Sequence, residues 1–256
     1  MLLRRIDVPV LRECNEVGEN LQEHYSLIMQ WRLKHAVSQN PQFGGWCLYR
    51  NTLRYFLFRS GPMANATFEA LAFLRSKFDR KRPDVQFLIA PCPIDFKAKA
   101  MAVEDSHGMQ IGGYSLGPAP KGKLHITSRS PSAPPRTAID FFAQESDRRA
   151  MLAVVRMAPK LCETEPLASM IEGEVRPGKE IQNEADILEA YRANGTIACH
   201  AVGTCRMGKH TESAVDLKAR VRGIDNLSTV DLSILHFVAE GTISGLYAQL
   251  FGAQPS

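Results

Sequence analysis

Apolar and polar residues alternate in several stretches of the chain, which is the pattern of a half-buried β-strand. The first such stretch is HYSLIMQWRL at residues 24–33. Four further strand candidates follow, separated by turns that contain Pro and Gly: DVQFLIAPCPI at 84–94, MQIGGYSL at 109–116, KLHITS at 123–128 and TAIDFFA at 137–143. Because the last four of these strands succeed one another without an intervening helix, we predict an antiparallel sheet.

Helical periodicity occurs on both sides of these strands. The segment ANATFEALAFLRSKF at 64–78 has apolar residues at helical spacing and polar residues that can cap its start. The segment at 145–162 has acidic residues at its front, and NEADILEAYRANG at 183–195 ends on a glycine. We predict three helices here and expect the last two to cover the sheet.

The carboxy-terminal part of the chain has a different pattern. ARVRGI at 219–224 and LSTVDLSI at 227–234 are typical of short strands, and GTISGLYAQLF at 241–251 is typical of a helix opened by a glycine turn. Helices beside an antiparallel sheet, followed by a strand-strand-helix segment, predict the α+β fold class.

Composition and charge narrow the possible partners. The chain has 256 residues, 45% of them apolar, which is enough for one large domain or two modest ones. Lys and Arg exceed Asp and Glu by only 31 to 27 and are spread out, so we expect no nucleic-acid partner. We find no apolar run long enough for a signal peptide or a membrane span. The six cysteines lie at irregular spacings, so we expect them to be reduced in a cytoplasmic protein.

One short loop, ACHAVGTCRMG at 198–208, concentrates reactive side chains. Cys199, His200, Cys205 and His210 are possible metal ligands, but their spacing matches neither half of a typical zinc site. Arg206 could stabilise a Cys205 thiolate for nucleophilic attack. A small buried packing residue is the alternative for both cysteines, since free Cys is among the most buried residue types.

His200 stands before small residues and a turn, which gives its ring room to project. An imidazole with a pKa near about 6.5 can act as a general base near neutral pH. A purely structural histidine is the alternative, because no partner is visible in the sequence around it.

A family resemblance distinguishes between these alternatives. HAVGTCRMG from residue 200 and AVDLKARVRGIDNLSTVDLSIL from residue 214 resemble the carboxy-terminal segment of the glucose-methanol-choline (GMC) flavin-dependent oxidoreductases. That segment reads H-x-x-G-T-x-R-M-G, then V-D-x-x-x-R-V-x-G-x-x-x-L-x-V-x-D-A-S. Weaker matches occur at 6–24, which ends in NEVGENLQEH, and at 121–142. The chain is therefore similar to the substrate-side and carboxy-terminal half of that family's fold.

The resemblance implies a domain division and a cofactor. Residues 1–25 would border the FAD domain, 26–196 would form the substrate-binding domain with its antiparallel sheet, and 197–256 would be the carboxy-terminal part of the FAD-binding domain. FAD is the implied cofactor. However, no G-x-G-x-x-G stands between a strand and a helix in this sequence, so we expect a separate chain to supply the ADP-binding half.

The resemblance also implies site residues. His200 takes the position of the catalytic histidine, which acts near the hydroxyl of a small-molecule alcohol whose hydride goes to flavin. Thr242 takes the second catalytic position, where the family has Asn or His, and a threonine cannot act as a second base. Asp231 and Leu232, with Thr242 and Ile243, match residues beside the flavin.

Three polar residues of the matched segments, Arg206, Asp216 and Asp231, also have structural interpretations. Asp231 can instead cap or turn its own backbone, as Asp commonly does. Arg206 and Asp216 are expected to form an internal ion pair rather than to bind substrate.

Two functions are compatible with this pattern. The first is the substrate-side half of a GMC-type alcohol dehydrogenase or oxidase of the choline dehydrogenase kind. The alternative is a truncated, catalytically inactive remnant that acts at most as a binding or interaction module. A cysteine-histidine metal protein is a third and weaker possibility.

Overall fold

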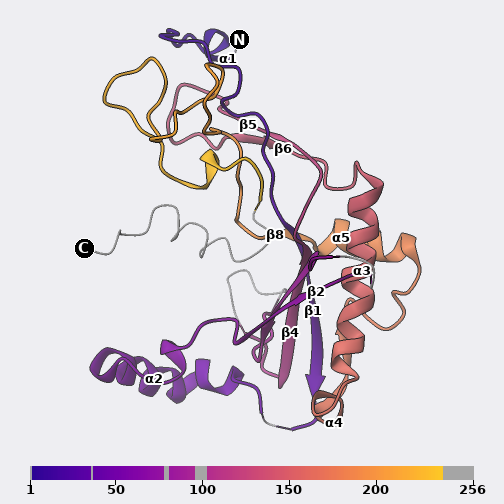
Figure 1. Ribbon diagram of the computed structural model, residues 1–256. Coiled ribbons are helices and arrows are strands. Elements are labelled where there is room, and N and C mark those ends of the chain that lie inside the picture. Colours follow the sequence, from indigo (N-terminus) through magenta and orange to yellow (C-terminus); the bar gives the residue numbers. More distant parts are fainter. Residues whose placement is uncertain (1, 36, 78–80, 96–102, 239–256) are drawn as a thin grey trace. The chain divides into compact units, whose positions relative to one another are not determined.

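The computed structural model describes residues 2–35, 37–77, 81–95 and 103–238 (Figure 1). The chain divides into two compact units. The first consists of Met1–Tyr25, Leu116–Arg148 and Ile197–Ser256, and the second of Ser26–Ser115 and Arg149–Thr196. Residues 116–148 thus group with the two terminal segments, whereas the sequence placed them with 26–196. The functional assignment of these parts stays a prediction.

The second unit is built on an antiparallel sheet, as predicted. The strand order is β2-β3-β4-β1-β7, and every pair of neighbours in it is antiparallel. These strands are β1 (Tyr25–Leu33), β2 (Ala70–Leu74), β3 (Val85–Ala90), β4 (Gly108–Ser115) and β7 (Ile171–Arg176).

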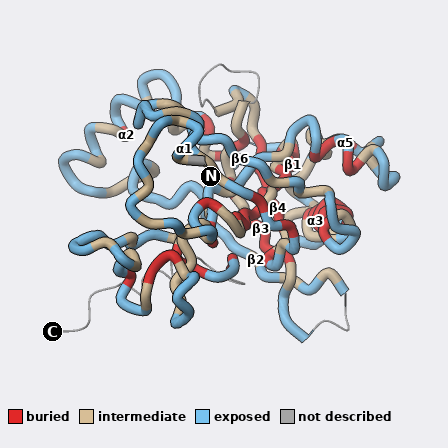
Figure 2. Tube along the Cα trace, turned by 90° about the horizontal axis from the view of Figure 1, so that it is seen from above, coloured by how far each residue is buried: buried red, intermediate tan, exposed pale blue. Residues whose placement is uncertain are grey.

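The core of this unit lies between the central strands and a long helix, α3 (Glu145–Cys162). Buried residues follow β1, β3, β4 and α3 (Figure 2). A Cβ added at Gly113 would lie 2.5 Å from Cγ1 of Val154 on α3 and 2.7 Å from Cε1 of Phe87 on β3. A strand glycine therefore allows the helix to pack closely on the sheet.

This packing of helices beside an antiparallel sheet confirms the α+β class that the sequence predicts.

Both helices predicted to accompany the sheet are present. The range of α3 is the one that the sequence predicts, with Glu145 and Asp147 in its first turn, where acidic groups favour the helix dipole. The helix α5 (Glu184–Asn194) begins after Asn183, whose side chain accepts a hydrogen bond from the Asp186 N–H. Shorter elements complete this unit: the 3₁₀ turns η1 (Asn40–Phe43) and η2 (Pro62–Ala64), and the helix α4 (Leu167–Met170).

The helix predicted at 64–78 is wrong. Residues Ala70–Leu74 form the strand β2, which pairs with β3 in a register that sets Ala72 opposite Phe87. The apolar residues that suggested a helix can equally form a sheet edge, and pairing with β3 decides between the two structures. This is a case in which tertiary pairing overrides local propensity.

A helix that the sequence reading did not identify, α2 (Gly45–Phe58), carries an exposed apolar stripe. Trp46, Tyr49, Leu53, Phe56 and Leu57 recur at helical spacing, and all of them are more than half exposed. The polar residues Arg50, Asn51 and Arg54 share the helix with this stripe. Large contiguous apolar surfaces of this kind are uncommon on isolated soluble domains.

The first unit contains little regular structure. It has a helix α1 (Leu2–Arg5), a hairpin of β5 (Lys123–His125) and β6 (Arg136–Ala138), and a 3₁₀ turn η3 (Leu232–Ile234), while the two-residue strand β8 (Thr196–Ile197) lies where the units meet in sequence. β5 and β6 confirm a strand at the start of each stretch predicted at 123–128 and 137–143, but both strands are shorter than predicted and residues 141–142 form a turn.

The strands predicted at 219–224 and 227–234 are wrong. These segments make only isolated bridges, such as Arg220 with Ser228, before the η3 turn. Two small apolar clusters hold them instead of a sheet: one of Val202, Leu235 and Val238, the other of Val215, Ala219 and Ile234. The helix predicted at 241–251 lies outside the described residues.

The different burial of two phenylalanines gives a stability test. Phe87→Ala removes a side chain that is fully buried, so it should lower the free energy of unfolding by about 3–5 kcal/mol. Phe56→Ala on α2 removes one that is 66% exposed and should change it by less than about 0.5 kcal/mol. Urea denaturation of both variants measures this difference. Equal losses would contradict the assignment of the core.

Candidate active site

The loop that contains His200 is held on both sides by backbone hydrogen bonds. On one side, Gln22 and Val202 exchange two N–H···O bonds of 3.1 and 2.9 Å, and Gly18 N–H donates to the Thr204 carbonyl at 2.8 Å. On the other side, Cys205 N–H donates to the Ser233 carbonyl at 2.9 Å. The two segments that carry the family resemblance most strongly, 200–208 and 214–235, therefore meet the weaker match at 6–24 in one unit.

Gly203 permits this close approach. Its φ of 91° lies in the left-handed region that favours glycine. A Cβ at this position would collide with the backbone carbonyl oxygen of Asn20. The glycine of the H-x-x-G-T pattern is thus required by both conformation and space.

Glu23 is a buried carboxylate that joins the two segments at the site. Its side chain is only 3% exposed, and it accepts the His200 N–H at 2.9 Å from each oxygen and the His24 N–H at 2.8 Å. Burial raises the pKa of Glu23, and hydrogen bonds from the backbone N–H groups of His200, His24 and Ala201 partly oppose this effect. These bonds satisfy backbone donors that the loop cannot pair within itself.

His24 lies against His200. The two Nδ1 atoms are 3.3 Å apart, the ring planes are inclined by 84°, and Nε2 of His24 lies 3.3 Å from the backbone oxygen of Leu116. Burial lowers the pKa of His24 to about 4, with a smaller contribution from His200, and burial also lowers the pKa of His200. Both rings are therefore neutral near pH 7, the state that a general base requires.

His24 and Glu23 were not identified as site residues from the sequence, although both lie in the quoted NLQEH segment. The sequence did contain a signal that could have identified them, namely a histidine directly after an acidic residue in a segment that resembles the family. Only the fold shows that this histidine faces His200, which lies 176 positions away in sequence.

The ion pair predicted between Arg206 and Asp216 is wrong. Arg206 donates to Glu16, with Nε 2.9 Å from Oε2 and Nη2 closer still. Asp216 instead pairs with Arg220, its local neighbour, at 2.7 Å, and hydrogen bonds from Arg220 lower the pKa of Asp216 to about 2. The backbone crossing of 14–18 with 204–206 brings Glu16 to Arg206.

The cysteines of the loop differ from one another. Cys199 is exposed, with a φ of 61°, so its predicted packing role is wrong. Cys205 is half-buried, and burial raises the pKa of its thiol, which is the opposite of what a thiolate nucleophile needs. Within the described ranges, we find no group of three His, Cys, Asp or Glu side chains that could hold a metal ion.

The predicted cofactor-contact residues lie in a turn beside this loop. The Asp231 carboxylate accepts the Ser233 N–H at 2.8 Å and caps the η3 turn, which begins at Leu232. Its capping role is therefore present in the structure. Thr242 and Ile243 lie outside the described residues.

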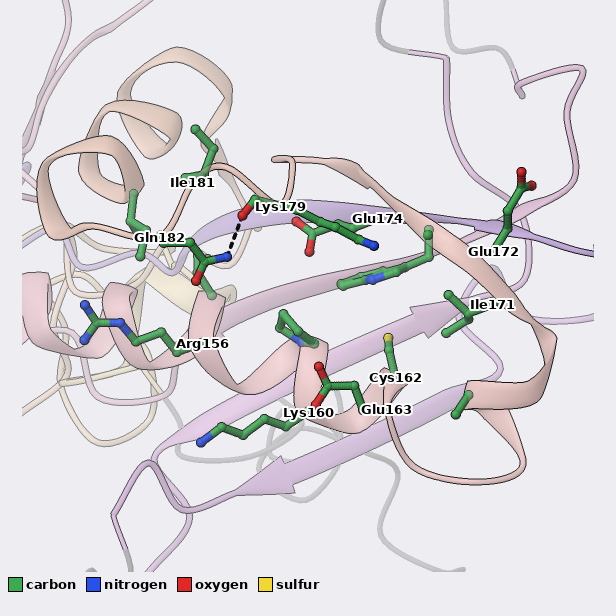
Figure 3. A pocket seen from close by; sticks show the side chains of 16 residues that line it. Arg156, Lys160, Cys162, Glu163, Ile171, Glu172, Glu174, Lys179, Ile181 and Gln182 are labelled. Carbon is green, nitrogen blue, oxygen red and sulfur yellow. Dashed lines mark hydrogen bonds between the residues drawn. The ribbon is translucent and has the colours of Figure 1, made fainter.

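The sheet unit has a separate cavity of about 730 Å³ between α3 and β7 (Figure 3). Trp31, Cys162 and Glu174 are among its lining residues. Burial, reinforced by the nearby Glu174 and Glu163, raises the pKa of the Cys162 thiol to about 12, which makes this thiol unreactive near neutral pH. None of the described residues that line this cavity is among the site residues predicted from the sequence.

Comparison with known proteins identifies the class to which this fold and site belong. Residues 118–248, more than half of the chain, match the family model described as GMC oxidoreductase. The chain therefore belongs to the GMC oxidoreductase family, and the resemblance seen in the sequence is confirmed.

Relatives extend this similarity to almost the whole chain. It is 30% identical over 243 residues to an oxygen-dependent choline dehydrogenase of Klebsiella pneumoniae subsp. pneumoniae, covering 95% of this chain and 44% of the relative. An oxygen-dependent choline dehydrogenase of Escherichia coli O9:H4 is 29% identical, with 95% and 43% covered. The chain thus spans less than half the length of these curated relatives.

Solved structures agree on the fold. A formate oxidase superposes with a TM-score of 0.84 at 20% identity, covering 97% of this chain and 48% of that one. Pyridoxine 4-oxidase from Mesorbium loti gives a TM-score of 0.77 at 19% identity, with 97% of this chain and 45% of that one covered.

None of the described helices is long and apolar enough to cross a membrane.

The Glu23 contacts predict a large cost for its removal. Glu23→Ala leaves the backbone N–H groups of His24 and His200 without their acceptor in a buried site, at about 1–3 kcal/mol for each group. We expect a loss of roughly 3 kcal/mol or more in the free energy of unfolding, measured by urea denaturation. The matched control Glu13→Ala removes an exposed carboxylate and should change little. Equal effects of the two substitutions would refute the role given to Glu23.

The lowered pKa of His24 predicts a pH dependence of stability. Between its unfolded value of 6.5 and its folded value of about 4, the unfolded chain binds a proton that the folded chain does not. The free energy of unfolding should therefore fall as pH is lowered through this window, by on the order of 3 kcal/mol from this group.

Urea denaturation across this pH range measures the effect in the wild type and in His24→Gln. The variant should show a shallower pH dependence, whatever its absolute stability. His210→Gln, which replaces an exposed histidine, should keep the wild-type slope. The same slope in all three proteins would show that His24 is not the group responsible.

Proposed function

We propose that this chain is the substrate-side half of a GMC-type FAD-dependent oxidoreductase that oxidises the CH–OH group of a small alcohol, with His200 as its general base. The observation that carries the proposal is the half-buried His200 ring, held by Glu23 through its backbone and by His24 through its side chain, and burial lowers its pKa. Proton transfer by such a group typically contributes about 10² to 10⁴ in rate.

The family membership supports this reaction over metal or thiol chemistry. Among the curated relatives, those named oxygen-dependent choline dehydrogenases match almost the whole of this chain. We therefore propose a small hydroxylated substrate, with choline as the first compound to test. His200 would take the hydroxyl proton, and Thr242 would provide at most a hydrogen bond at the second catalytic position.

The turn at Asp231 and Leu232 supports the proposal that this segment borders a flavin. Asp231 and Leu232 form a tight turn, and the neighbouring Val230 and Phe237 expose apolar side chains that suit a large planar ring. When bound there, FAD would supply the hydride acceptor. We propose that Asp231, Leu232, Thr242 and Ile243 contact it, and that a second chain provides the phosphate-binding turn that this sequence lacks.

A catalytically inactive remnant that acts as an interaction module is the second candidate. Thr242 in place of a second base favours it, as does the exposed apolar stripe of α2. The two candidates differ in whether His200 affects a reaction.

Co-expression with a reading frame that encodes a G-x-G-x-x-G flavin-binding half tests the proposal. The purified complex should retain flavin absorbance and oxidise an alcohol. His200→Asn should keep the flavin and lose about 10² to 10⁴ in kcat, because it removes the base alone. His210→Asn is the control and should leave kcat unchanged. A complex without flavin, or a His200→Asn complex with full activity, would exclude the proposed function.

A further inference from the structure

The acceptor beside His24 determines which of its nitrogens carries a proton. Nε2 of His24 lies 3.3 Å from the backbone oxygen of Leu116, and a carbonyl oxygen can only accept a hydrogen bond. This contact is a hydrogen bond only if Nε2 is protonated. The ring is completely buried, so an unmade bond at this carbonyl would be costly.

The neutrality of His24 then determines the other nitrogen. A neutral imidazole carries one proton, so a ring protonated at Nε2 has an unprotonated Nδ1 that can only accept. Burial keeps this ring neutral near pH 7, since it lowers its pKa to about 4. The neighbouring charged group, the Glu23 carboxylate, is already occupied by the backbone N–H groups of His24 and His200.

The same reasoning carries over to His200 through the contact between the rings. Two Nδ1 atoms at 3.3 Å repel one another if both have a lone pair, and they clash if both carry a proton. Since Nδ1 of His24 accepts, Nδ1 of His200 must donate. A neutral His200 then has its single proton on Nδ1.

We infer that His24 is a positioning residue that fixes the proton of His200 on Nδ1, so that Nε2 of His200 is the basic nitrogen of the site. Leu116 sets the tautomer of His24, and His24 sets that of His200. When Nε2 gains a proton, the Nδ1–H of His200 continues to donate to His24, so neither ring has to turn. The part of this inference that concerns catalysis rests on the proposed function; the part that concerns the tautomers does not.

Nitrogen-15 NMR of the histidine rings in the isolated, labelled chain near pH 7 tests the tautomers without flavin or substrate. Protonated and unprotonated ring nitrogens have well-separated chemical shifts, and the chain has seven histidines to assign. We expect His200 to be protonated at Nδ1 and His24 at Nε2. A His200 ring protonated at Nε2 in the wild-type chain overturns the inference directly, and no variant is needed for this result.

His24→Phe tests the cause, because it keeps a ring of similar size and removes the acceptor. We expect the His200 shifts to move toward those of the Nε2-protonated form, while His210→Phe leaves them unchanged. Unchanged Nδ1 protonation of His200 in a folded His24→Phe chain would overturn the role of His24. In the flavin-containing complex, His24→Phe should lower kcat more than it changes KM, since an incorrect histidine tautomer costs about 10⁴ in kcat in a serine protease.

These measurements separate the inference from the proposed function. An inactive complex whose chain shows the expected tautomers contradicts only the proposed function. An active complex whose His200 is protonated at Nε2 contradicts only the inference.

Discussion

The buried carboxylate of Glu23 is the interaction on which the candidate site depends. It accepts backbone N–H groups from two segments, at His24 and at His200, that are far apart in the sequence. This attachment explains why a loop with little regular structure can hold a histidine ring in one position. The small apolar clusters around Val202 and Val215 support the loop from its other side. Stability and chemistry thus depend on the same few contacts in the first unit.

The second unit contributes the regular part of the fold. Its antiparallel sheet, covered closely by α3 at Gly113, is an ordinary packed core. The pocket between α3 and β7 belongs to the same unit, and burial keeps the thiol of Cys162, which lines it, protonated. The chemistry that we propose is therefore placed in the first unit, which contains His200 and the segment after it. The family match at 118–248 covers parts of both units.

Much of the sheet unit could be predicted from the sequence, and the site could be predicted only in part. Strong local patterns gave β1, β3, β4, α3 and α5, since alternation and end caps are encoded in neighbouring residues. The strand β2 and the turns after residue 214 depend on partners elsewhere in the chain, so local patterns misassigned them. The family motif identified His200. It gave no indication of the ion pair between Arg206 and Glu16 or of the contact between the two histidines, because side-chain partners depend on how distant segments cross.

The central claim is that His200 is the base of an alcohol-oxidising site completed by a flavin-binding half. Anaerobic mixing of that complex with choline, followed by flavin absorbance, tests this claim most directly. The account predicts rapid bleaching of the flavin in the wild-type complex and bleaching slowed by about 10² to 10⁴ in the His200→Asn complex. Bleaching at the same rate in both complexes would contradict it.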